Sequence, residues 1–93
     1  MSLRETYEKK MQGQLSELKA EIAELRGKAD QAETNLQLEY YTLIDELHLK
    51  LETANQKFHL LKQASDENWD EFKSEFELIW VSVRELIKSV TSP

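Results

Sequence analysis

The sequence lacks cysteine, and its single proline is the last residue, Pro93. Without cysteine the chain can form neither a disulfide nor a thiolate metal site, which fits the cytoplasmic location that we predict. The only glycines are Gly13 and Gly27, and so few breakers in 93 residues favour long helices. The longest apolar run has four residues, 78–81, against the roughly 20 that a membrane-spanning helix needs.

Basic residues are outnumbered by acidic ones. The chain has 12 Lys and Arg against 18 Asp and Glu, a net charge of −6, and no basic stripe. Such a surface repels phosphate backbones, so we expect no nucleic-acid partner. The excess of carboxylates lies in residues 65–93, which contain three basic and seven acidic residues.

Apolar residues recur about every 3.6 positions from Leu3 to Val90, most densely over 36–51. This period predicts an all-α protein with one helical domain, 1–93. We expect a long helix over about 3–64, near 90 Å at about 1.5 Å per residue, and a shorter helix over about 66–90. The fold class is therefore a long-helix coiled coil or a helical hairpin that assembles into an oligomeric helical bundle.

Two joints leave alternatives open. The segment 30–33 resembles a second capped helix start shortly after Gly27, and a break there would give three helices. At the second joint, Ser65 is a good N-cap and is followed by Asp66 and Glu67, yet the apolar stripe keeps its phase through this segment. The chain either turns at Ser65 or continues as one helix. Ser2 and Glu5 form a predicted capping box at the start of the chain.

A single rod of this kind would expose its apolar stripe to water, and such stripes mark association. We therefore expect a homo-oligomer, a dimer or a tetramer, with parallel or antiparallel chains. The predicted oligomer or core interface consists of Leu18, Ile22, Leu25, Leu36, Tyr40, Leu43, Leu47, Leu51, Phe58 and Leu61.

The C-terminal segment repeats its apolar residues at eleven-residue spacing, which places both copies of the repeat on one helix face. Leu78, Val81 and Leu86 are expected to widen this face. Three interpretations are open: packing within the bundle, binding to a lipid surface, or docking of a helical partner protein. The predicted aromatic interaction face consists of Trp69, Phe72, Phe76, Trp80, Val83 and Ile87.

Residues for catalysis are sparse. There is no Gly-rich phosphate loop and no cysteine nucleophile, so we expect no enzyme and no cofactor. His48 and His59 are eleven residues apart, about 16 Å along a helix, which is too far for one metal ion. Asp45 precedes His48 by three residues, a spacing related to that of di-iron bundles, but such sites need several more inward carboxylates. We predict no metal site.

Several short segments are spread along most of the chain: Lys9-Lys10-Met11, Lys28-Ala29-Asp30, Ala32-Glu33, Tyr40-Tyr41, Leu61-Lys62-Gln63-Ala64, Trp69, Phe72-Lys73 and Trp80. In these residues the chain resembles a group of small bacterial coiled-coil proteins of unknown function. The resemblance implies a bacterial helical assembly protein and supplies no activity. Asn68 and the bulky residues after Trp69 depart from the Ala-rich pattern of that group. Residues 69–90 also resemble the eleven-residue repeats of exchangeable apolipoproteins.

Taken together, the sequence predicts a non-enzymatic module for self-assembly or protein–protein interaction. The first alternative is peripheral binding to a lipid surface through the amphipathic helix 69–90. The second is a monomeric three-helix bundle that acts as an adaptor.

Overall fold

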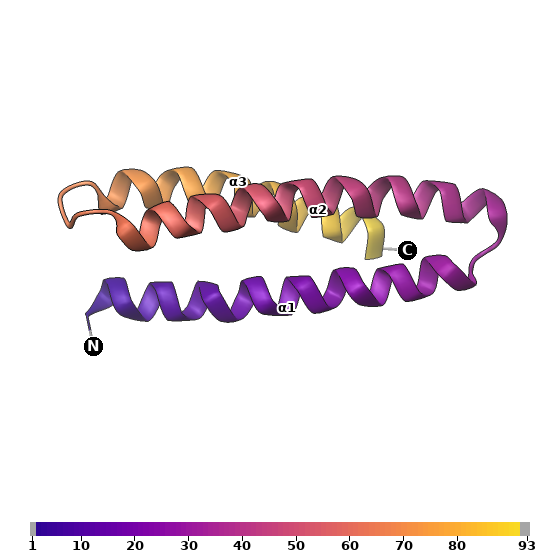
Figure 1. Ribbon diagram of the computed structural model, residues 1–93, viewed down its shortest axis with the longest axis horizontal. Helices are drawn as coiled ribbons and strands as arrows, with labels where there is room; N and C mark the ends of the chain where they lie inside the picture. The colour runs from indigo at the N-terminus through magenta and orange to yellow at the C-terminus, as the bar shows by residue number, and fades with distance from the viewer. Residues whose placement is uncertain (1, 92–93) are drawn as a thin grey trace.

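Three helices form an antiparallel bundle, which a computed structural model describes for residues 2–91. They are α1 (Leu3–Gln31), α2 (Thr34–Gln63) and α3 (Trp69–Thr91), and each runs back along the one before it (Figure 1). No strand occurs among these described residues. The predicted all-α helical bundle is thereby confirmed. Met1, Ser92 and Pro93 of the predicted 1–93 domain lie outside the described residues.

The predicted continuous helix over 3–64 is wrong. The chain stays helical through Gly27, as expected, but α1 ends at Gln31 and α2 begins at Thr34. Ala32 (φ −80°, ψ 163°) and Glu33 (φ −63°, ψ 152°) between them are extended. The longest dimension is 51 Å instead of the expected length near 90 Å.

The break at 32–33 allows the two halves of the apolar stripe to cover each other within one chain. A rod would leave that stripe in water and forgo a burial free energy of roughly 25 cal/mol per Å² of apolar surface. Contacts across the turn hold it in place: the Gln37 side-chain amide donates to the Asp30 carbonyl at 3.2 Å, and the Tyr41 hydroxyl donates to the Asp30 carboxylate. The turn needs no glycine because extended backbone is open to any residue.

The chain also turns at the second joint, and α3 begins at Trp69 rather than at Asp66. The Asn68 carbonyl accepts from the amides of Glu71 and Phe72 at 3.1 and 3.2 Å, so Asn68 is the residue that opens the helix. The predicted N-cap, Ser65, instead accepts a backbone bond from Asn68 at 3.1 Å, within the turn. At the start of α1, the Ser2 hydroxyl accepts from the Glu5 amide at 3.1 Å, as predicted.

One continuous hydrophobic core runs between the helices. Fifteen apolar residues are buried in it: Met11, Leu15, Leu18, Ile22, Leu25 and Ala29 of α1; Ile44, Leu47, Leu51, Ala54, Phe58 and Leu61 of α2; and Phe76, Val83 and Ile87 of α3. Among residues 2–90, no polar or charged residue is buried. No helix of this described part is both long and apolar enough to cross a membrane.

Candidate interaction surfaces

Most residues of the predicted interface lie inside the single chain. Leu18, Ile22, Leu25, Leu47, Leu51, Phe58 and Leu61 are buried between the three helices. Tyr40 and Leu43 are half-buried, and Leu36 is 47% exposed. The structure therefore brings this set together along the bundle, but the members on the first turns of α2, Leu36, Tyr40 and Leu43, are only partly covered.

The aromatic face of α3 packs inward. Phe76 is fully buried; its ring centroid lies 5.4 Å from that of Phe58 and 6.1 Å from that of Trp80, with which it stacks. Val83 and Ile87 are buried beside it, while Trp69, Phe72 and Trp80 are half-buried against the core. Leu78 and Val81 do not widen this face as expected, because they are 76% and 53% exposed on the outer side of α3.

Arg4 ties the start of α1 to the end of α2. Its guanidinium donates to the carbonyls of Lys62 and Ala64 at 3.2 and 2.7 Å and to the carboxylates of Asp66 and Glu8 at 2.8 and 2.9 Å. A cation near the last carbonyls of a helix also complements the helix dipole. This end of the bundle, with the α2–α3 turn, is therefore held closed by a charged network.

Trp69 and Tyr7 complete the closed end. The Trp69 indole donates to Glu8 at 3.0 Å, and its ring meets the ring of Tyr7 edge-on at 5.5 Å. The Tyr7 hydroxyl donates to Glu77 at 3.0 Å, and Lys73 Nζ lies 4.8 Å from the centroid of the Tyr7 ring. Burial, with the hydrogen bond to Glu77, raises the pKa of Tyr7 well above its ordinary value. The contacts join α1 to α3 directly.

The opposite end of the bundle is open. α3 has 23 residues against 30 in α2, and in Figure 1 its C-terminal end stops short of the α1–α2 turn. The difference of seven residues corresponds to about 10 Å of helix. A depression of about 440 Å³ lies there, lined by Leu38, Glu39, Thr42 and Leu43. We call Leu36, Leu38, Tyr40 and Leu43 the open end.

Leu36 lies on the same face of α2 as the buried core. Leu47, Ala54 and Leu61 follow it at spacings of eleven, seven and seven residues, which return to nearly the same direction on a helix. Those three residues are 0% exposed, whereas Leu36 is 47% exposed. The core-forming face of α2 thus continues beyond the helix that covers it.

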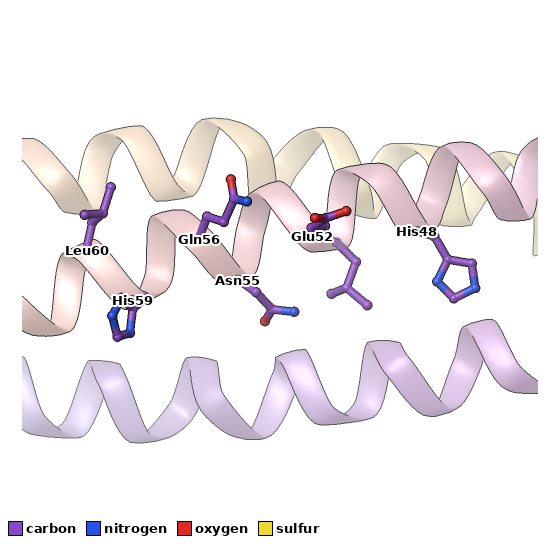
Figure 2. Close-up of a pocket in the computed structure, with 7 residues that line it drawn as sticks. His48, Glu52, Asn55, Gln56, His59 and Leu60 are labelled. Carbon is purple, nitrogen blue, oxygen red and sulfur yellow. The ribbon is translucent and has the colours of Figure 1, made fainter.

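A shallow depression of about 720 Å³ lies along the exposed side of α2 (Figure 2). It is lined by His48, Leu51, Glu52, Asn55, Gln56, His59 and Leu60. All of these except Leu51 are exposed, and all come from one helix. Within residues 2–91, no three His, Cys, Asp or Glu side chains are grouped so that they could hold a metal ion.

Some features are not apparent from the sequence pattern. The sequence places Arg4 within the predicted capping box and indicates no other role for it. Its hydrogen-bond partners, the carbonyls of Lys62 and Ala64, are about sixty residues away in the chain. The apolar character of Leu78 and Val81 predicts burial. Their exposure depends on which side of α3 packs against α2, which the sequence does not specify. Nothing in the sequence around Asp30 indicates its contact with Tyr41, eleven residues further on, a hydrogen bond that raises the pKa of that tyrosine.

Comparisons of the chain with protein-family models, curated proteins and solved structures find no match.

Proposed function

We propose that the protein is a non-enzymatic helical module that self-associates through its open end. The observation that carries the proposal is the exposure of Leu36, which continues a row of fully buried residues on α2. The apolar face of α2 extends beyond the end of the helix that packs on it. Such a surface favours association, because burial removes it from water. The sequence predicted an oligomer along the whole stripe; we now restrict the contact to one end.

A second copy suits this surface. In a two-fold arrangement the α1–α2 end of each copy occupies the position that α3 leaves uncovered in the other, so each gap is filled by the same element. The charges at this end are compatible with such pairing. Lys88 lies in the last turn of α3, and Asp30 and Glu33 lie at the α1–α2 turn that would approach it.

Light-scattering mass over a range of protein concentrations tests the proposal. Covering the exposed half of one Leu36 contributes about 1 kcal/mol, so a symmetric dimer gains about 2 kcal/mol from the pair. Leu36→Gln should therefore raise the dissociation constant about thirty-fold while leaving helicity unchanged. Leu49→Gln is the matched control, because Leu49 is 66% exposed on the outer side of the same helix. A wild-type chain that stays monomeric at about millimolar concentration, where contacts of about 4 kcal/mol are detectable, contradicts the proposal.

The monomeric three-helix adaptor is the second candidate. It is favoured by the core, which the three helices of one chain already bury. A monomer at every concentration, with unchanged behaviour of Leu36→Gln, would support it.

Lipid binding through the α3 aromatic face requires that α3 leave the bundle, because Phe76 and Val83 are 0% exposed. Unchanged Trp emission on addition of vesicles would argue against that alternative. The cytoplasmic location stays a prediction.

A further inference from the structure

The outer side of α3 carries an exposed apolar pair with several carboxylates beside it. Leu78 is 76% exposed and Val81, one turn further along, is 53% exposed. With Ser74 and Glu77 they line a depression of about 430 Å³. The pair does not contribute to the core, and it is separate from the open end.

Three carboxylates lie on the same side of α3 as Leu78. Glu71, Glu75 and Glu85 lie seven residues before, three before and seven after it, which places all of them near the same line along the helix. All three are exposed. None of the ion pairs in the described part of the chain involves them; on α3 the pair is Lys73 with Glu77. Lys50 of α2 donates to the Ser82 hydroxyl at 2.6 Å. On α3 itself the exposed cations Arg84 and Lys88 lie beyond Val81, so the carboxylates predominate on the Leu78 side of the pair.

We propose that Leu78, Val81 and the carboxylates beside them on α3 form a docking surface for a basic amphipathic helix of another protein. An apolar pair at a spacing of three residues makes a ridge along the helix, which matches the apolar face of a second helix laid beside it. Lysine or arginine residues flanking that face would meet Glu71, Glu75 and Glu85. The charge pattern therefore specifies the partner more closely than the apolar pair alone does.

The same charges disfavour two other occupants. A second copy of this chain bound in parallel through the same surface would place three carboxylates against three carboxylates, and like charges that face each other oppose association. An antiparallel copy would set Glu71 and Glu75 opposite Lys88 and Arg84, and its loss in the Leu78 and Val81 double variant would identify it. An anionic lipid surface would be repelled for the same reason. This inference does not depend on the self-association proposed above, because the two surfaces share no residue.

Isothermal titration of the full chain with a designed peptide tests the inference. The probe is a synthetic helix of about 20 residues, long enough to be helical, with leucines along one face and lysines on both sides of it. A second peptide carries glutamate in place of every lysine. We expect the lysine peptide to bind, its affinity to fall at least about tenfold between about 0.05 and 0.5 M salt, and the glutamate peptide not to bind.

Variants of α3 assign the binding to this surface. The double change Leu78→Gln and Val81→Gln should weaken binding of the lysine peptide at least about tenfold. The triple change Glu71→Gln, Glu75→Gln and Glu85→Gln should weaken it at low salt and remove most of the salt dependence. Leu49→Gln and Leu36→Gln are controls on other surfaces and should bind like the wild type. All of these changes are at exposed positions, so circular dichroism should report an unchanged fold.

Several results would overturn the inference. They are no binding of the lysine peptide, equal binding of the glutamate peptide, or unchanged binding by the Leu78 and Val81 double variant. Self-association of the double variant distinguishes the two proposals, since it should equal that of the wild type. Peptide binding by a chain that never dimerises would leave the docking surface standing and remove the proposed self-association.

Discussion

Replacing Phe76 with alanine tests whether α3 folds back on the core of its own chain. Phe76 is 0% exposed and packs between the rings of Phe58 and Trp80, on α2 and α3. Its neighbour Leu78, two residues on, is 76% exposed on the same helix. Substitution at Phe76 should therefore destabilise the protein strongly, and substitution at Leu78 of the same helix should not.

The expected loss follows from what the phenyl ring buries. Removal of a buried Phe side chain costs about 3 to 5 kcal/mol, including the cavity that is left, and the aromatic contact with Phe58 adds to the loss within that range. For a domain of this size, each kcal/mol lowers the melting temperature by about 4 to 8 °C, so Phe76→Ala should lower it by at least about 12 °C. Leu78→Ala should change the unfolding free energy by less than about 0.5 kcal/mol.

Thermal and urea unfolding followed by circular dichroism measure both effects. Wild type and variant are compared at two protein concentrations, because an intramolecular core predicts the same loss at each concentration. If Phe76→Ala does not fold, Phe76→Leu supplies the comparison, with an expected loss of about 1 to 2 kcal/mol. The reasoning is refuted if Phe76→Ala is no more destabilising than Leu78→Ala, or if its loss disappears on dilution.

Three further perturbations are informative. Arg4→Ala should lower the melting temperature more than Lys10→Ala on the same helix, because Arg4 bonds the end of α2 and Asp66; equal melting temperatures would show that the closed end is not held by Arg4. Gly27→Ala should stabilise the protein by about 1 kcal/mol, since Gly27 is helical and a Cβ there would meet nothing within 4 Å; a loss in urea unfolding would contradict an open position. Stability should fall as pH rises above about 10, because the unfolded state releases the Tyr7 proton first when folding raises its pKa. Tyr7→Phe should lose less stability between about pH 9 and pH 11 in the same assay, and an identical decline would exclude Tyr7 as a cause.

The sequence by itself determined that the protein is helical and identified most of the residues that are buried. The scarcity of glycine and proline, together with the 3.6-residue period, fixes the helices without reference to tertiary contacts. Leu18, Leu47 and Phe76 are buried as their positions in the stripe predict. That prediction holds whichever chain supplies the covering helix, because the hydrophobic effect depends on burial and not on the identity of the neighbour.

Only the tertiary structure decided where the chain turns and which surfaces remain exposed. The turn at Ala32 and Glu33 lies in the segment 30–33 that resembles a capped helix start, but extended backbone is open to any residue, so the sequence does not decide between a turn and a continuous helix. Arg4 acquires its role from carbonyls about sixty residues away. Leu36 continues the same row as Leu47 yet is exposed because α3 is seven residues shorter than α2. Periodicity specifies the direction of a side chain on its own helix, whereas exposure depends on the length and placement of the helices beside it.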